Sequence, residues 1–145
     1  MSFRYLSILS AVLLSAFSFS TISIAQNNQT PKSQQAQSVI ADQLSAFLND
    51  DGPRAFSHAA PSIKQIFRTP KNFMTMVERG YGPIYRSTTY DFGRSTLNED
   101  QIIQEIILTD QKGNTWQSIY VLKEQSDGSL KIMGVEMRPS QNTIL

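Results

Sequence analysis

The chain contains no cysteine, and this absence excludes a disulfide framework, a thiolate metal site and a cysteine nucleophile. It has a single histidine, His58, and lacks the histidine and carboxylate spacing of a metal site, so we expect no metal and no other cofactor. An excess of one charge is also missing, because 13 Lys and Arg residues stand against 12 Asp and Glu residues. Without the positive field that nucleic-acid binders need, we do not expect nucleic acid as a partner.

Long apolar runs are missing as well, except at the N-terminus. There Arg4 precedes the apolar stretch 6–19, and Ser23 and Ala25 place small residues before a cleavage point. This pattern predicts a secretory signal peptide over residues 1–25. The alternative is an uncleaved anchor, since the stretch with its flanks is about long enough to cross a bilayer. We favour cleavage, and expect an exported protein, periplasmic or secreted, with no stable membrane span afterwards.

Residues 26–37 are rich in Gln and Asn and poor in apolar side chains. Such a stretch buries too little apolar surface to offset the entropy of ordering it, so it predicts a flexible polar leader. The following residues, 38–140, are enough for a single domain with its own core. Because cysteine is absent, this domain has to rely on apolar packing in an oxidising compartment.

Helical spacing follows the leader. Apolar residues recur every three or four positions over 36–49, which predicts an amphipathic helix. Pro53, Pro61 and Pro70 each suit the first turn of a helix, and they predict three further, shorter helices. The last of these should end at Gly80, because glycine favours the left-handed cap of a helix C-terminus.

Beyond the helices the apolar period shortens toward two, which is typical of β-strands. Turn residues between the segments favour a sequential antiparallel meander, with one longer loop over 93–100. The predicted strands are 84–92, 101–109, 115–124 and 130–137. N-terminal helices packed on a curved four-stranded antiparallel sheet make an α+β domain.

The second and third predicted strands are apolar on both faces. On one strand Ile102, Ile106 and Leu108 alternate with Ile103 and Ile107. On the other strand Trp116, Tyr120 and Leu122 alternate with Ile119 and Val121, so that one face packs against the helices and a second apolar face is left. A sheet with one face in water would alternate apolar and polar residues more cleanly. The second face therefore requires the long first helix, a partner subunit or a ligand, and we expect a homodimer or a protein partner there.

Residues 70–86 read Pro-Lys-Asn-Phe-Met-Thr-Met-Val-Glu-Arg-Gly-Tyr-Gly-Pro-Ile-Tyr-Arg. This block resembles the hallmark of a family of small exported bacterial proteins that is classed only as a domain of unknown function. The likeness extends over residues 38–134 and includes Asp50-Asp51-Gly52, Thr115-Trp116 and Asp127-Gly128-Ser129. The order of elements is also similar, more loosely, to the cystatin-like cone folds of the nuclear-transport-factor-two and ketosteroid-isomerase type. The resemblance implies such a fold and no activity.

Few residues suggest acid–base chemistry. His58 has no acidic residue near it in the sequence that could act as its partner. Asp91 and Glu105 lie on predicted strands and are the best candidate acids for a cavity, but neither has an evident base partner. We therefore assign no catalytic residue.

Aromatic residues and arginines gather at the predicted helix-to-sheet corner and on the strands. Aromatic rings with polar tips, together with guanidinium groups, suit a small polar or anionic ligand in a mostly apolar pocket. The alternative is structural, since Tyr and Trp are ordinary strand residues. The candidate ligand-binding residues, called here the aromatic–arginine cluster, are Arg79, Tyr81, Tyr85, Arg86, Tyr90, Trp116 and Tyr120.

Two functional hypotheses follow from these patterns. The first is a non-catalytic module that binds a ligand or another protein. The alternative is a cone-fold enzyme that uses acid and base residues in a cavity between helices and sheet, such as Asp91 or Glu105 with a tyrosine. The position of these acids in the fold separates the two hypotheses.

Overall fold

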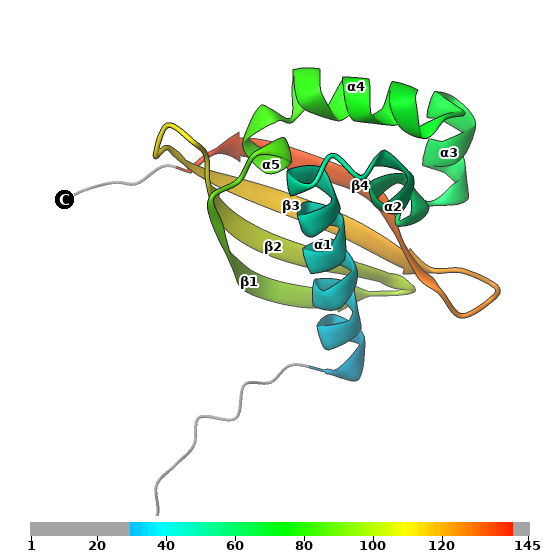
Figure 1. The fold of residues 1–145 in the computed structure, drawn as a ribbon. Helices are drawn as coiled ribbons and strands as arrows, with labels where there is room; N and C mark the ends of the chain where they lie inside the picture. Colours follow the sequence, from blue (N-terminus) through cyan, green and yellow to red (C-terminus); the bar gives the residue numbers. More distant parts are fainter. Residues whose placement is uncertain (1–29, 141–145) are drawn as a thin grey trace, which may run out of the picture.

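The structure, a computed structural model, describes residues 30–140. Within them, helices precede a four-stranded sheet, which confirms the predicted α+β order (Figure 1). The predicted signal peptide and the start of the predicted leader lie outside the described residues. The helices are α1 (Pro31–Leu48), α2 (Gly52–Ser57), α3 (Pro61–Phe67), α4 (Pro70–Gly80) and α5 (Gly82–Tyr85), and the strands are β1 (Thr89–Asn98), β2 (Gln101–Thr109), β3 (Thr115–Glu124) and β4 (Leu130–Pro139). Over 30–140, the helices are all too short or too polar to cross a membrane.

Helix α1 begins earlier than the sequence predicted. The side chain of Thr30 accepts a hydrogen bond from the backbone N–H of Ser33 and so caps the helix. Residues 31–37 are helical, and the prediction of a flexible leader was wrong for them. Ser33 is buried, and the Gln37 amide donates a hydrogen bond of 3.2 Å to the side chain of Gln104 on β2. Contacts with the sheet thus stabilise a polar helical turn that has little stability of its own.

The three helices predicted at Pro53, Pro61 and Pro70 lie close to their predicted positions. Helix α4 runs from Pro70 to Gly80 as predicted, and α3 begins at Pro61. The side chains of Asp51 and Thr69 accept hydrogen bonds from backbone N–H groups in the first turns of α2 and α4. These caps satisfy donors that a helix start would otherwise leave unpaired.

The sheet confirms the predicted meander. Its order is β1-β2-β3-β4, and each neighbouring pair is antiparallel. Strands β2 and β3 have the predicted bounds, and β4 extends two residues past the predicted end, to Pro139.

The first strand was predicted too early. Gly82–Tyr85 forms the short helix α5, in which the backbone N–H groups of Ile84 and Tyr85 donate to the carbonyl of Tyr81. Strand β1 begins only at Thr89 and includes most of the segment predicted as the loop 93–100. The polar composition of this edge strand concealed it, since its exposed residues need not alternate with apolar ones.

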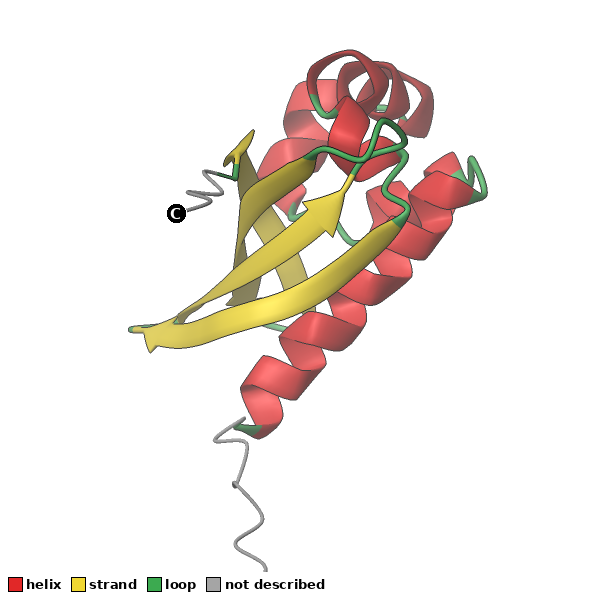
Figure 2. Cartoon of the chain, turned by 90° about the vertical axis from the view of Figure 1, so that its left-hand side faces the viewer, coloured by secondary structure: helices red, strands yellow, loops and turns green. Residues whose placement is uncertain are grey.

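The helices gather on one side of the sheet, as Figure 2 shows. The core lies between the two layers and consists of apolar residues from α1, α2, α4, α5 and the inner face of β2, β3 and β4. Helix α1 contributes Ile40, Leu44 and Phe47 to it, and β3 contributes Tyr120 and Leu122, all fully or almost fully buried. Apolar burial of this extent is the main stabilising term for a fold without crosslinks.

The second face of the sheet carries one of the two apolar sets of β2 and β3. Ile103, Ile107, Ile119 and Val121 are half-buried there. Helix α1 packs on the inner face together with the other helices (Figure 2). It therefore does not cover the second face, which leaves a partner subunit or a ligand as the predicted cover. A partner remains a prediction.

A backbone turn between α3 and α4 gives the first testable prediction. Arg68 has φ 64° and ψ −36°, and across it the N–H of Thr69 donates to the carbonyl of Phe67 at 2.7 Å. This three-residue turn is strained for any residue with a Cβ atom. Arg68→Gly should raise the free energy of unfolding by about 1 kcal/mol, because glycine adopts positive φ without that strain.

Urea unfolding followed by the fluorescence of the single tryptophan, Trp116, measures the effect. The control is Arg68→Ala, which removes the same charge but keeps the Cβ atom and should bring no gain. An equal gain in both variants would show that charge, not strain, is responsible.

Candidate ligand-binding pocket

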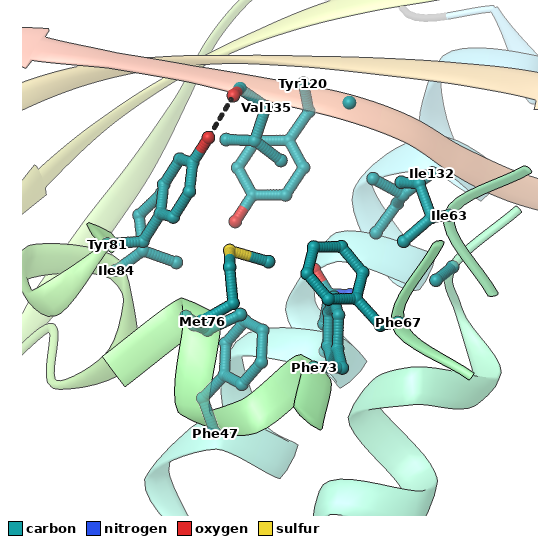
Figure 3. A pocket seen from close by; sticks show the side chains of 14 residues that line it. Phe47, Ile63, Phe67, Phe73, Met76, Tyr81, Ile84, Tyr120, Ile132 and Val135 are labelled. Atoms are coloured by element: carbon teal, nitrogen blue, oxygen red, sulfur yellow. Dashed lines mark hydrogen bonds between the residues drawn. The ribbon is translucent and has the colours of Figure 1, made fainter. Parts of the chain in front are cut away.

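A pocket of about 200 Å³ lies between the helical layer and the inner face of the sheet. Its helical walls come from the end of α1 and from α3, α4 and α5, and its sheet wall comes from β3 and β4 (Figure 3). The lining residues are Gln43, Phe47, Ala59, Ile63, Phe67, Phe73, Met76, Val77, Tyr81, Ile84, Tyr120, Ile132, Gly134 and Val135.

Aromatic packing builds the helical wall. The ring of Phe73 on α4 lies 6.2 Å from Phe47 of α1, 5.3 Å from Phe56 of α2 and 5.9 Å from Phe67 of α3, measured between ring centroids. Contacts of this kind add to the burial energy and fix the angles at which the helices meet. Phe73 therefore joins four helices at one side of the pocket.

Helix α3 is the loosest part of the wall. Ile63 and Phe67 line the pocket but are only half-buried, and Ile66 on the same helix is 71% exposed. Unlike its neighbours, α3 contributes no fully buried residue. The pocket is thus bounded on one side by a short helix with few packing constraints.

The pocket carries no charge, because none of its lining residues between positions 30 and 140 is Asp, Glu, Lys, Arg or His. Its polar groups are few. The Gln43 amide donates to the carbonyl of Ala55 at 3.1 Å, and the Tyr81 hydroxyl donates to the carbonyl of Val135 at 3.2 Å.

Tyr120, unlike Gln43 and Tyr81, has a polar group that is unpaired within residues 30–140. Its side chain is fully buried, and its hydroxyl has no hydrogen-bond partner among the described residues. Figure 3 shows this hydroxyl pointing into the pocket toward the sulfur of Met76. Burial, with a smaller effect of Tyr81, raises the pKa of Tyr120 far above its usual value, so the phenol stays protonated and can donate a hydrogen bond.

The structure brings only two members of the aromatic–arginine cluster to this pocket, Tyr81 and Tyr120. Sequence reasoning missed the apolar lining, although the single apolar faces of α3 and α4 carry a helical spacing that could have indicated it. The missed residues include Ile63, Met76 and Val135.

Tyr85 and Arg86 lie together at a different place. Both bind Asp50 in the turn after α1, with distances of 2.5 Å from the Tyr85 hydroxyl and from Arg86 Nη2 to Asp50 Oδ1. Arg86 also donates to the carbonyl of Phe47 at 2.5 Å and stacks 3.8 Å from the Tyr85 ring. Arg86 and then Tyr85 lower the pKa of Asp50. These contacts tie the end of α1 to the corner between α5 and β1.

The other cluster members are dispersed. Trp116 Nε1 donates to Asp110 at 2.9 Å, Tyr90 packs 5.5 Å from Phe92, and Arg79 is exposed in the last turn of α4. The seven residues therefore do not form one site. Their prediction as ligand-binding residues stays a prediction, with only Tyr81 and Tyr120 in the pocket.

Comparisons with known proteins place the chain in a family. Residues 29–144 match the family described as Domain of unknown function (DUF4864). The chain belongs to this family. The resemblance of the 70–86 block to an uncharacterised family is thereby confirmed.

Two solved structures are similar to this DUF4864 chain. One is an NTF-2 like protein of unknown function from Burkholderia xenovorans LB400, with 11% identity, 74% of this chain and 84% of that chain covered, and a TM-score of 0.45. The other is an NTF2-like protein of unknown function from Burkholderia pseudomallei K96243, with 10% identity, 73% and 91% coverage, and a TM-score of 0.40. No curated protein matches the chain.

The candidate acids of the enzyme hypothesis lie away from the pocket. Asp91 is exposed on the edge strand β1, and Glu105 is half-buried on the second face of the sheet, opposite Ile119. Neither lines the pocket. In the described part of this DUF4864 chain, no three metal-ligand side chains come together either.

His58 has a partner that the sequence did not reveal. Asp42 on α1 places Oδ2 2.5 Å from His58 Nε2 at the end of α2, and the Arg54 guanidinium binds both oxygens of the same carboxylate. This ion pair links α1 to α2 outside the pocket lining. Because it connects residues on two helices, sequence spacing gave no signal of it.

Asp42 gives a prediction for the pH dependence of stability. Hydrogen bonds from Arg54 and then His58 lower the pKa of Asp42 from 3.8 to about 2. The folded state therefore binds this proton more weakly than the unfolded state. The stability that the carboxylate supplies is fully present above pH 3.8 and is lost as the pH falls through about 2.

Asp42→Asn should accordingly lower the free energy of unfolding near neutral pH and flatten its fall between pH 4 and pH 2. Urea unfolding at a series of pH values measures both effects. Asp91→Asn is the control, because Asp91 is exposed and forms no ion pair within residues 30–140. Parallel pH curves for wild type and Asp42→Asn would contradict the prediction.

Proposed function

We propose that this domain is an exported, non-catalytic module that binds a small molecule in the pocket between its helices and its sheet. The observation that carries the proposal is the uncharged apolar pocket of about 200 Å³ with few polar groups. Ligand sites are usually concave, mostly apolar and supplied with a small number of directed polar groups. Export is proposed on the signal-peptide pattern of residues 1–25.

The volume limits the size of the ligand. Sites for drug-sized molecules have roughly 300–1,000 Å³, whereas a dry cavity of about 150 Å³ holds benzene. A pocket of about 200 Å³ therefore fits a single ring with a short substituent, or a branched chain of similar size.

The side chains that line the pocket favour ligand binding over acid–base catalysis. General acid–base chemistry needs a titratable group within hydrogen-bond reach of the reacting atom. The candidate acids Asp91 and Glu105 lie elsewhere, and His58 is paired with Asp42 outside the lining. Only tyrosines are titratable among the described lining residues.

Filling the pocket tests the proposal. Ile63→Trp on α3 adds an indole at the pocket wall, and Ile66→Trp is the matched control, because Ile66 lies on the same helix but is exposed and outside the lining. Toluene at roughly ten times its Kd should raise the melting temperature of the wild type and of Ile66→Trp by about 5 °C. It should leave Ile63→Trp unchanged.

Differential scanning calorimetry with and without toluene measures the shift, and native mass spectrometry of the protein from its own host would reveal a co-purifying molecule. If toluene shifts neither the wild type nor the control, the pocket does not take small apolar molecules. If it shifts all three proteins equally, binding occurs elsewhere.

A second candidate function, association with a protein, is favoured by the half-buried apolar residues Ile103, Ile107, Ile119 and Val121 on the second sheet face. Contiguous apolar residues that water still reaches are typical of interaction sites. The partner that we propose for this face is a second copy of the chain or another protein.

Ile119→Lys tests self-association. The new ammonium group would lie between Glu105 and Glu136, the register neighbours of Ile119, so the fold should tolerate it. In analytical ultracentrifugation at micromolar concentration, the wild type should sediment as a dimer and Ile119→Lys as a monomer. Leu48→Lys, which replaces an exposed apolar residue of α1, is the control and should stay dimeric. A monomeric wild type would rule out the homodimer.

A further inference from the structure

The Tyr120 hydroxyl is the least satisfied group of the pocket. It sits on β3, one of the two central strands, is fully buried, and finds no hydrogen-bond partner among residues 30–140. A buried polar group without a partner destabilises the folded state, whereas phenylalanine would fill the same space without that penalty. A hydroxyl in such a place indicates a role beyond packing.

The neighbouring polar groups are already engaged. Tyr81 directs its hydroxyl hydrogen to the carbonyl of Val135, and the Gln43 amide donates to the carbonyl of Ala55. The group toward which the Tyr120 hydroxyl points is the thioether of Met76, a weak acceptor (Figure 3). The donor of Tyr120 is thus directed into the space that a ligand would fill.

We propose that the pocket selects a neutral, compact apolar molecule with one hydrogen-bond acceptor, such as a carbonyl oxygen, which accepts a hydrogen bond from Tyr120. This inference rests on the proposed ligand-binding function and names the class of ligand. The apolar remainder of the molecule packs against the rings and aliphatic side chains of the lining, such as Phe73, Met76 and Ile132.

The ligand is neutral because the pocket offers no counter-charge. A carboxylate or ammonium group would lose its hydration there without an ion pair to replace it. The sequence raised an anionic ligand on account of Arg79 and Arg86, but neither arginine lines the pocket, and Arg86 is bound to Asp50.

The acceptor is specified by the same geometry. A site whose buried donor lacks a protein partner binds an analogue without the acceptor more weakly, because the donor then stays unpaired in the complex. Shape alone discriminates such isosteres poorly. Tyr120 is therefore inferred to be the specificity-determining residue of the pocket.

Two isosteric probes, acetophenone and α-methylstyrene, test the inference. Acetophenone has a carbonyl oxygen at the position where α-methylstyrene has a methylene group. Wild type should bind acetophenone about tenfold more tightly, a ratio that corresponds to about 1.4 kcal/mol. In Tyr120→Phe the preference should reverse, because the carbonyl then loses its hydration without a donor to replace it, and acetophenone should bind more weakly than α-methylstyrene. Tyr81→Phe is the control, since it removes a hydroxyl that bonds the protein, and it should keep the preference.

Isothermal titration calorimetry gives the affinities, and the infrared carbonyl stretch of bound acetophenone gives a second readout. Its frequency should be lower in the wild type than in Tyr120→Phe, because a donated hydrogen bond weakens the carbonyl bond. Tyr120→Phe should also be at least as stable as wild type toward urea, since its hydroxyl has no protein partner among the described residues.

The outcomes separate this inference from the proposed function. Equal binding of both probes to the wild type would overturn the role of Tyr120 and leave the pocket as a ligand site. Failure of both probes to bind the wild type would overturn the inference and the proposed function together. Tighter binding of benzoate than of acetophenone would overturn the neutral class of ligand. A wild-type carbonyl frequency equal to that of free acetophenone in an apolar solvent would also contradict the hydrogen bond.

Discussion

Burial of the inner sheet face beneath the helices is the constraint on which the other features of this domain depend. Without cysteine, and without a cluster of metal ligands in the described residues, the layers are held by apolar contact and by a few polar links. Ile40, Leu44 and Phe47 fix α1 on the sheet, and the remaining helices are positioned relative to it. The ion pair of Asp42 with Arg54 and the hydrogen bond between Asp42 and His58 then fix α2 against α1.

The pocket follows from the way these layers meet. Helices α4 and α5 approach β3 and β4 at an angle (Figure 1), and the short helix α3 closes the remaining side with only partly buried residues. The helices and strands meet at this point without filling the space between them. The surrounding core side chains are closely packed and cannot move into that space, so a cavity remains. The unpaired Tyr120 hydroxyl in this cavity is a departure from satisfied polar burial, and such departures often coincide with function.

The residues that carry the family resemblance divide into two groups by their contacts. Asp50, Tyr85 and Arg86 form one polar link between the end of α1 and the corner before β1. Phe73 and Met76, from the same hallmark block, line the pocket instead. The block thus contains both residues that hold the helices in place and residues that shape the candidate site. The other members of the aromatic–arginine cluster belong to neither group. Trp116 and Tyr90 make contacts on the strands, and Arg79 lies at the surface.

Sequence patterns alone determined the α+β class, the sequential meander, the bounds of α4, β2 and β3, and the two apolar faces of the sheet. These features depend on periodicity and turn chemistry, which act between residues close in the chain. The start of α1, the short helix α5 and the extent of β1 were decided by tertiary contacts, which override weak local preferences. Only the tertiary structure could bring Asp42 to His58, or place Tyr120 beneath α4 with its hydroxyl unpaired. Such contacts join residues that are distant in the sequence, and no local spacing encodes the distance between them.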